Sequence, residues 1–359
     1  MSGNDDRLYN LRRYGRNSLS YLTIADDVLV FTGEWKGYIA YKTFLSTAIV
    51  LGDPITPDES LQSALRSFKE YNSSRNMSIC FFCSTDRTLP ALKQEGFKSI
   101  YIGKEAVIDL RSFNLNGKKR ASIRSSIHHA ERHNLTVEEY QYNTERSSSI
   151  ETEIHAISEE WKHIRRMPEL TFAFGHVDFN RYKDVRYFIC RHQGRITGFI
   201  SLYPIYASNS YYLDLTRRRI NSPRSTIDYL IVESLKKLKE EGVNRVYIGF
   251  SPLSFIGSED KFNSNLIREL LVLFKPLFHF FYPARSEFFF KDKFATDWEP
   301  NYICYYPRMS MNLLLSLIHI LYPGGIGGLM INKIKYSLPI SISKKDVYEN
   351  TDTQGREES

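Results

Sequence analysis

The sequence contains few cysteines and no arrangement of them that would hold a metal. Four occur in 359 residues, at Cys80, Cys83, Cys190 and Cys304. Cys80 and Cys83 are close together, but they lie in an apolar run, residues 78–83, that predicts a buried strand, and a second close pair is missing. A zinc site is therefore not expected, and the cysteine usage is typical of a reducing, cytoplasmic location.

The sequence also lacks a secretory signal, since no apolar stretch follows the charged N-terminal residues. Its longest uncharged stretch, residues 309–332, has the length of a membrane span. However, Pro323 and the glycines after it end a helix at about Tyr322, which leaves roughly 13 residues, or about 20 Å, against a hydrocarbon core of about 30 Å. We therefore expect residues 309–335 to form a packed helix or a membrane-surface anchor, followed by a polar, disordered tail over residues 336–359.

The composition is that of a globular protein with a basic surplus. Hydrophobic residues make up 42%, charged residues 25% and aromatic residues 14%, and the formal net charge is +7. The length favours two domains, each large enough for its own core. The positive charge favours an anionic partner, which can be a nucleic acid or a lipid surface.

The order of predicted elements nearly repeats itself along the chain. In the first half, strands flank the turn at residues 33–37, and a helix capped by Asp58, a strand at 79–82, a short helix at 89–94 and a strand pair ending at Leu110 follow. In the second half, strands at 187–190, 196–202 and 211–216 precede a long helix that has Pro223 in its first turn and ends at Gly242. A strand at 245–250, a helix at 265–274 and a strand at 278–282 complete the second half.

This duplication predicts an α/β (α+β) fold of tandem acyltransferase-type units, with mixed sheets flanked by helices, rather than one large sheet. We expect domains at residues 1–116 and 148–308, joined by a basic helix and linker at 117–147. The glycine-rich loop that holds the pyrophosphate of acetyl-CoA in such folds is missing from both halves. An acetyl-CoA-dependent N-acetyltransferase is therefore disfavoured, because without glycines the backbone cannot approach a pyrophosphate closely.

Seven short strings, in this order, resemble one known family. They are Tyr14-Gly15-Arg16-Asn17-Ser18-Leu19-Ser20-Tyr21, Gly52-Asp53-Pro54-Ile55, Glu105-Ala106-Val107-Ile108-Asp109-Leu110, Leu213-Asp214-Leu215-Thr216-Arg217, Gly249-Phe250-Ser251-Pro252-Leu253, Lys291-Asp292-Lys293-Phe294 and Trp298-Glu299-Pro300. Over about residues 14–307 the chain resembles the C-terminal synthase domain of phosphatidylglycerol lysyltransferases, the multiple peptide resistance factor family.

The resemblance implies a tandem GNAT-like fold, an aminoacyl-tRNA donor and an anionic lipid acceptor such as phosphatidylglycerol. It implies no cofactor and no metal. Full members of the family carry a multi-helix flippase before this domain, whereas only a short polar arm precedes Tyr14. We therefore expect this protein to transfer an aminoacyl group, lysyl, to a lipid but not to translocate the lipid product. We expect it to be cytoplasmic and to bind peripherally to the inner face of the cell membrane.

The chemistry needs orientation, proton transfer and oxyanion stabilisation, because the donor ester is already activated. Asp214 interrupts an apolar strand where this fold opens its central cleft, so it is the first candidate for binding the ammonium of the aminoacyl group. The alternative is that Asp214 forms a structural ion pair with Arg217 or Arg218. We also place Arg217 in the catalytic set. Asp228, early in the long helix, and Ser251, after a strand, complete this set; their alternatives are helix-dipole pairing and a plain turn.

Two further groups of residues are assigned to substrate binding. Lys291 and Lys293 lie two apart, which on a strand would place them on one face toward a phosphate, unless the strand is a solvated edge. Tyr212 and Glu299 are assigned to the substrate with them. A basic helix then presents Arg120, Arg124, His128 and Arg132 as one stripe at i+4 spacing, with Lys118 and Lys119 before it. This stripe fits tRNA or lipid phosphates, although it can be a solvated face.

Two other functions stay open on the sequence alone. A FemX-like transferase uses the same donor and the same duplicated fold, but attaches amino acids to a peptidoglycan precursor or a peptide amine. A non-catalytic module that binds RNA or a membrane surface would need only the basic stripe and the tail. Asp214 argues against such a module, because a charge inside an apolar strand is costly unless it has a structural role.

Overall fold

A computed structural model of the chain describes residues 3–165, 175–180, 183–252, 254, 284–322, 324 and 327–328. Within these residues, one mixed sheet has the strand order β1-β2-β3-β4-β11-β5-β10-β9-β8-β7-β6. Its strands are β1 (Leu29–Phe31), β2 (Ile39–Phe44), β3 (Thr47–Leu51), β4 (Ser78–Ser84), β5 (Lys98–Asp109), β6 (Thr136–Tyr140), β7 (Arg186–His192), β8 (Arg195–Ile205), β9 (Ser210–Arg218), β10 (Arg245–Pro252) and β11 (Asp297–Tyr306). The pairs β3/β4 and β9/β10 are parallel, and the other neighbouring pairs are antiparallel.

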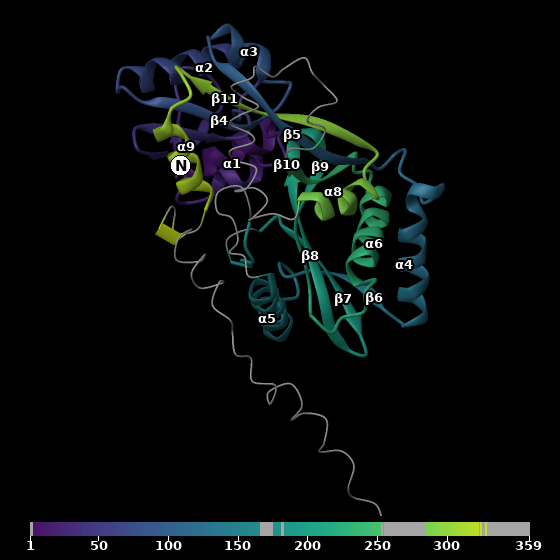
Figure 1. Cartoon of the computed structure of the whole chain (residues 1–359). Helices are drawn as coiled ribbons and strands as arrows, with labels where there is room; N and C mark the ends of the chain where they lie inside the picture. The colour runs from purple at the N-terminus through teal and green to yellow at the C-terminus, as the bar shows by residue number, and fades with distance from the viewer. Residues whose placement is uncertain are drawn as a thin grey trace, which may run out of the picture.

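Helices cover both faces of this sheet (Figure 1). They are α1 (Gly3–Tyr14), α2 (Asp58–Ser73), α3 (Leu89–Gln94), α4 (Ala121–Arg132), α5 (Ser148–Arg165), α6 (Thr226–Glu240), α8 (Ala284–Asp292) and α9 (Met311–Leu321), with 3₁₀ turns η1 (Ser20–Ile24), η2 (Lys118–Arg120) and η3 (Tyr206–Ser208). We call the side that carries α1, α5 and α9 the α5 face, and the side that carries α2, α3, α4 and α6 the α6 face.

The hydrophobic core is divided by the sheet, because successive strand residues point to opposite faces. On β8, Phe199 and Tyr203 pack in the cluster of the α5 face, together with Ile154 of α5. Ile200 and Leu202 pack in a second cluster with α4 and α6. A third cluster, beneath α2 and α3, covers the other half of the same side.

The predicted α/β class, with a mixed sheet flanked by helices, is confirmed. The amphipathic patterns located α2, α3, α5 and α6 to within a few residues, and Gly242 follows α6 with a φ of 77°, as a helix-ending glycine should. The run that contains Cys80 and Cys83 is the buried strand β4, and all four cysteines are buried thiols.

Several local predictions were wrong. The two halves share one sheet instead of two, because β5 pairs with β11 on one side and with β10 on the other. The strand pair expected to end at Leu110 is the single strand β5, which accommodates an irregularity near Gly103 instead of a turn. Asp58 is the first residue of α2, preceded by Pro57, so it does not cap that helix with its side chain.

Other predictions fall outside the described residues. They are the helix at 265–274, the strand at 278–282 and the polar tail at 336–359. The domain boundaries stay a prediction. Among the described residues, no helix is long and apolar enough to cross a membrane.

Candidate active site

The centre of the sheet opens where β9 and β10 separate. These parallel strands pair over three positions, ending at Tyr212 and Tyr247, while β9 continues to Arg218 and β10 to Pro252. Lys291, at the end of α8, reaches this opening: its Nζ donates a hydrogen bond to the Phe250 carbonyl at 2.8 Å. A Cβ added at Gly249 would lie 3.4 Å from that Nζ and 3.8 Å from the Tyr212 hydroxyl. Lys291 and Tyr212 therefore meet at the opening, as the substrate assignment requires.

The position of Lys291 corrects the expectation that it shares a strand face with Lys293. Lys291 lies in the last turn of helix α8 and is 5% exposed, whereas Lys293 lies in the turn after that helix. The Nζ of Lys293 contacts Oδ1 of Asp228 at 2.6 Å. Burial lowers the pKa of Lys291, while the nearby carboxylates of Glu287 and Glu105 oppose that shift.

Asp214 lies on β9 beyond the point where the strands separate. It is half-buried rather than fully buried as the apolar run suggested, and its Oδ1 accepts the backbone N–H of Gly175 at 3.1 Å. A Cβ at Gly175 would lie 2.6 Å from the other carboxylate oxygen and 1.7 Å from the Tyr203 hydroxyl. Tyr187, which is fully buried, is close enough for the charge of Asp214 to raise its pKa, although burial is the larger cause. Asp214 is thus surrounded by a glycine backbone and phenolic side chains.

Arg217 projects to the same face of the sheet, three residues along β9. Its guanidinium donates to the Ser158 hydroxyl of α5 and lies 5.2 Å from the ring centre of Trp161. The side chain is 2% exposed, so helix α5 holds it in a fixed position. The structure therefore brings Asp214 and Arg217 to the α5 face and anchors Arg217 on α5; their catalytic roles stay a prediction.

Glu105 is a buried carboxylate near the opening that the sequence reasoning did not select. It lies on β5 opposite Phe250 of β10 and opposite Glu299 of β11. The Ser18 hydroxyl donates to Glu105 Oε2 at 2.9 Å. Burial raises the pKa of Glu105 to about 8; the Ser18 hydrogen bond lowers it, the charge of Glu299 raises it, and the charge of Lys291 lowers it. A charge inside an apolar strand was the signal used for Asp214, and the same signal was present here.

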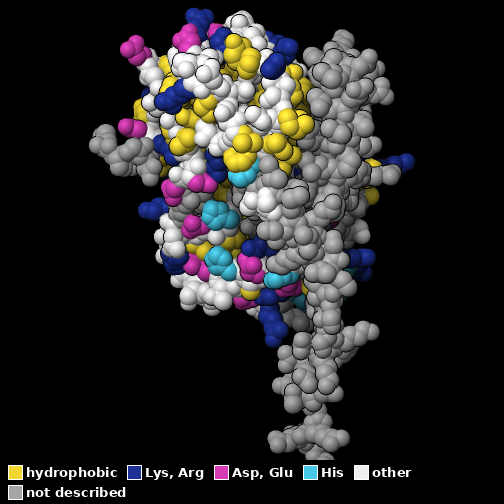
Figure 2. Space-filling model, turned by 60° about the vertical axis from the view of Figure 1, so that its left-hand side comes forward, with side chains coloured by type: hydrophobic (Ala, Val, Ile, Leu, Met, Phe, Trp, Pro, Cys, Tyr) yellow, Lys and Arg dark blue, Asp and Glu magenta, His cyan; other side chains and the backbone are white. Residues whose placement is uncertain are grey.

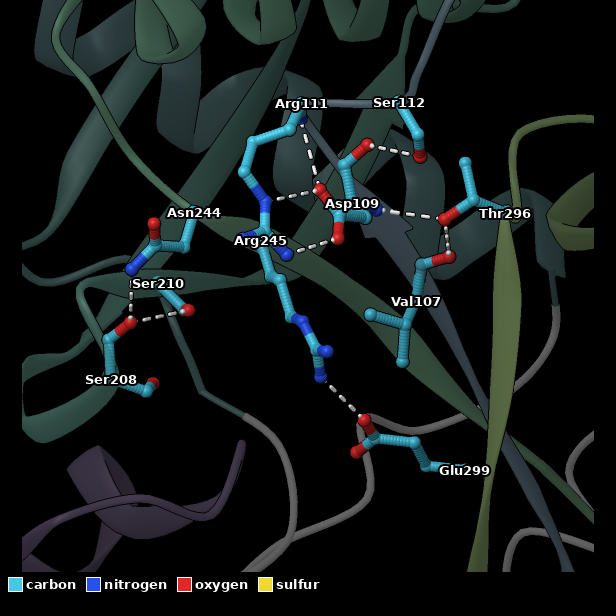
Figure 3. A network of polar contacts seen from close by, with 10 residues as sticks. All are labelled: Val107, Asp109, Arg111, Ser112, Ser208, Ser210, Asn244, Arg245, Thr296 and Glu299. Atoms are coloured by element: carbon cyan, nitrogen blue, oxygen red, sulfur yellow. Dashed lines mark hydrogen bonds and ion pairs between the residues drawn. The ribbon is translucent and has the colours of Figure 1, made fainter.

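Glu299 belongs to a polar network at the base of the opening (Figure 3). Its Oε1 accepts from the Arg245 guanidinium at 2.8 Å, and burial raises its pKa despite that cation. Nearby, the side-chain hydrogen bond from Arg111 lowers the pKa of Asp109 to about 2. In Figure 3 the Arg245 side chain extends from β10 toward Glu299 of β11, so this pair ties together strands that flank β5.

Asp228 and Ser251 make no hydrogen bond or ion pair with Asp214 among the described residues. Asp228 lies in α6, on the α6 face, where it also accepts from the Ser126 hydroxyl at 2.8 Å. Its partners are thus a lysine and a serine that hold α6 to its neighbours. Ser251 is on the β10 arm of the opening and is 1% exposed, and its hydroxyl has no hydrogen-bond partner among the described residues. Of these two residues, Ser251 is the one that lies on a strand bordering the opening.

The basic helix is α4, and its buried side is the predicted one, formed by Ile123, Ile127 and Ala130. The predicted outward stripe needs correction, because Arg120 is buried and donates to the carbonyls of Lys293 and Ala295. Its position just before α4 turns it toward the segment after α8. Arg124 is half-buried and donates to carbonyls of the preceding loop, at Leu115 and Gly117.

The exposed cations of this region are Lys118, Lys119 and Arg132. Lys119 forms an ion pair with Asp292 at 2.9 Å. Arg132, in the last turn of α4, donates to a backbone carbonyl of its own helix. An anionic partner would therefore meet the ends of α4 rather than a continuous stripe.

A polar cavity of about 610 Å³ lies away from this site, and none of the predicted site residues lines it. Two pairs of its charged lining residues form ion pairs, Arg12 with Asp184 at 2.9 Å and Arg186 with Glu139 at 2.7 Å. The part of the chain that the structure describes contains no group of three His, Cys, Asp or Glu residues able to hold a metal.

Comparison with known proteins identifies a family and a shared fold. Residues 9–305 match the family described as phosphatidylglycerol lysyltransferase, C-terminal. The phosphatidylglycerol lysyltransferase of Staphylococcus epidermidis is 27% identical over 305 residues, and that of Bacillus subtilis is 24% identical over 312 residues. These alignments cover 84% and 86% of this chain but 35% and 36% of the relatives, so the chain spans about a third of their length.

Solved structures share the fold. The C-terminal domain of a putative lysylphosphatidylglycerol synthetase from Agrobacterium fabrum has a TM-score of 0.76 at 22% identity, covering 90% of this chain and 98% of that one. The structure of L-PGS from Bacillus licheniformis has a TM-score of 0.74 at 22% identity, covering 93% and 97%. FemX is more distant, with a TM-score of 0.52 at 12% identity, covering 85% and 96%. Because the family match covers most of the chain, this protein belongs to the family of phosphatidylglycerol lysyltransferase C-terminal domains.

Proposed function

We propose that this protein is an acyltransferase that moves an aminoacyl group from aminoacyl-tRNA to a hydroxyl of phosphatidylglycerol. The aminoacyl group that we propose is lysyl. The observation that carries the proposal is the set of groups around the opening between β9 and β10. Asp214 lies on β9 and Ser251 on β10, both beyond the point where the two strands separate, and the Nζ of Lys291 donates to the carbonyl of Phe250, the residue before Ser251. The family membership supports the lipid acceptor, since the named relatives are phosphatidylglycerol lysyltransferases.

In this proposal the Asp214 carboxylate binds the ammonium of the aminoacyl group. Half-buried carboxylates bind cations more strongly than exposed ones, because less water competes and screens the charge. The Gly175 N–H at 3.1 Å and the neighbouring Tyr203 keep the carboxylate in place. Arg217, held by α5, supplies the positive charge that fits the tRNA end or the lipid phosphate.

The reaction itself requires one ester to be exchanged for another. The acceptor hydroxyl oxygen attacks the ester carbonyl, the bond to the ribose oxygen of the tRNA breaks, and the proton of the acceptor hydroxyl ends on that ribose oxygen. Lys291 and the Ser251 hydroxyl are the donors that would stabilise the negative carbonyl oxygen in between. No covalent enzyme intermediate is required, and burial raises the pKa of the Cys83 thiol well above its usual range, which disfavours a thiolate there.

The remaining parts of the proposal concern the partners. Lys118, Lys119 and Arg132, at the ends of α4, are the exposed cations for tRNA phosphates. Arg120 and Arg124 would contribute indirectly, by fixing the loops that carry these cations. The protein would act as a peripheral enzyme on the cytoplasmic side of the membrane, because both substrates meet there.

The decisive experiment supplies radiolabelled aminoacyl-tRNAs, one amino acid at a time, with lipids dispersed in detergent. We expect label in the organic phase with lysyl-tRNA and phosphatidylglycerol, and none when the tRNA is deacylated first. Parallel reactions offer a peptide amine in place of the lipid. Label in the peptide alone would replace this proposal with the FemX-like function, and label in neither would leave a binding role.

A further inference from the structure

Helix α9 has two apolar faces, and one of them is used by the fold. Leu313 and Ile320 are buried in the core cluster of the α5 face, and the Ser316 hydroxyl donates to the Phe44 carbonyl at 2.7 Å. The His319 ring stacks on Phe44 with 3.6 Å between ring centres. The helix is therefore packed against the core. A packed helix was one of the two roles expected for residues 309–335, and a membrane-surface anchor was the other.

The opposite face of α9 is also apolar. At 100° per residue, Met311, Leu315 and Ile318 lie on the side away from Leu313 and Ile320. Met311 is 65% exposed, and Leu315 and Ile318 are half-buried. A helix that only packs against a sheet has polar residues on its outer side, so this second apolar face needs another explanation.

The apolar surface continues into the turn between β2 and β3. Leu45, in that turn, is 43% exposed and follows Phe44, the residue that contacts α9. We call Met311, Leu315, Ile318 and Leu45 the α9 surface. Figure 2 shows hydrophobic side chains gathered over the part of the molecule that carries the N-terminal half of the sheet and α9.

We propose that the α9 surface docks the protein on the headgroup region of a lipid bilayer. This inference rests on the proposed function, which requires the enzyme to reach a lipid. Residues 309–322 contain no Asp, Glu, Lys or Arg, so insertion would bury no charge. Exposed Arg308 lies three residues before Met311, the first residue of α9, where it can meet anionic headgroups while the apolar side chains enter the acyl boundary.

The geometry selects a surface contact rather than a span. An 11-residue helix is about 16 Å long, about half the hydrocarbon thickness, so it would lie in the plane of the interface. Because α9 packs on the α5 face, docking would turn the face that carries Asp214 and Arg217 toward the bilayer.

Helix α9 lies beyond residue 305, where the match to the family ends, whereas Leu45 lies within the matched residues. A short apolar helix gives weak, reversible binding by itself, so we expect phosphatidylglycerol in the vesicles to strengthen the contact through nearby cations.

The test uses the full chain and sedimentation with vesicles of phosphatidylcholine alone or mixed with phosphatidylglycerol. The double variant Met311→Gln/Leu45→Asn removes two exposed apolar side chains; Leu45 has a φ of 42°, which asparagine tolerates. The matched control is Ile220→Gln, since Ile220 is 61% exposed and lies in the loop before α6. We expect the double variant to bind both kinds of vesicle roughly tenfold or more weakly, and the control to bind as the unchanged protein does.

Each outcome decides the inference. Equal vesicle binding by the double variant and the unchanged protein would overturn it. A change in oligomeric state in the double variant, seen by light scattering without vesicles and with vesicle binding unaltered, would assign the surface to a second copy of the chain. Transfer to detergent-dispersed lipid is measured separately: if the unchanged protein docks through α9 but transfers nothing, the proposed function fails and the docking surface stands.

Discussion

The backbone N–H of Gly175 donates a hydrogen bond to Oδ1 of Asp214 at 3.1 Å, and the same glycine packs against the Tyr203 hydroxyl. Glycine is needed there for lack of space, because a Cβ would lie 1.7 Å from the hydroxyl oxygen. This contact places an ordinary backbone amide against the carboxylate that we assign to substrate binding.

Gly175→Ala should therefore displace Asp214. Overpacking at such a contact costs about 1–3 kcal/mol, so we expect a lower melting temperature together with weaker aminoacyl transfer. Gly327→Ala is the matched control, since a Cβ at Gly327 meets no atom within 4 Å. An alanine variant at position 175 with unchanged turnover would show that the position of this carboxylate is not critical.

Asp214→Asn should abolish measurable transfer while the protein stays folded. The amide keeps the shape and the hydrogen bond from Gly175 but loses the charge that would hold an ammonium, a loss of roughly a hundredfold or more in kcat/KM. Steady-state kinetics and circular dichroism check the two parts. Glu138→Gln, at an exposed ion pair with Arg191, is the control for the loss of a carboxylate and should retain activity. Normal kinetics in Asp214→Asn would remove Asp214 from the site.

Glu105 should make stability depend on pH. Its pKa rises from 4.5 to about 8 on folding, mainly through burial, so between these values the folded protein holds a proton that the unfolded chain has lost. Stability from this group is therefore full below about pH 4.5 and declines as the pH rises toward 8. Glu105→Gln cannot titrate, so we expect its melting temperature relative to the unchanged protein to increase between pH 5 and pH 8. A constant difference across that range would contradict the shifted pKa.

The cations near α4 should separate into structural and binding groups. Arg120→Glu places an anion among the carbonyls of Lys293 and Ala295, so it should lower the melting temperature by several degrees. Lys118→Glu/Arg132→Glu changes exposed cations instead, and should leave melting unchanged while weakening tRNA binding and flattening its dependence on salt. If vesicle binding falls in the second variant and tRNA binding does not, these cations contact lipid.

Removal of α9 should destabilise the N-terminal half of the sheet. A chain that ends at Arg308 loses Leu313 and Ile320, which are fully or almost fully buried, at about 1.5–3 kcal/mol each. We expect thermal melting to fall by roughly ten degrees. A truncated protein with the same melting temperature would show that α9 contributes nothing to the core. Vesicle binding by the truncated chain is less informative than vesicle binding by the double variant Met311→Gln/Leu45→Asn. The reason is that the truncation removes core packing and can expose new apolar surface.

Burial that follows from local pattern was predictable, whereas the role of Asp214 stays a prediction. The spacing of Ile123 and Ile127 located the buried side of α4, and a carboxylate inside an apolar strand selected Asp214, because helical and strand periodicity are encoded within a few neighbouring residues. Glu105 carried the same signal as Asp214 and was missed. The family strings predicted the family, which the match over residues 9–305 confirmed.

The sequence by itself determined the element order, the apolar faces of the helices and the cost of placing a charge on a buried strand. Tertiary structure alone decided which distant segments meet. It inserted β11 between β4 and β5, turned Arg120 inward onto the segment after α8, and brought Lys291 to the opening between β9 and β10. These contacts join residues from about 40 to more than 200 positions apart in the sequence. Periodicity cannot specify such partners, because strand pairing and burial of a long side chain depend on how the whole sheet is assembled.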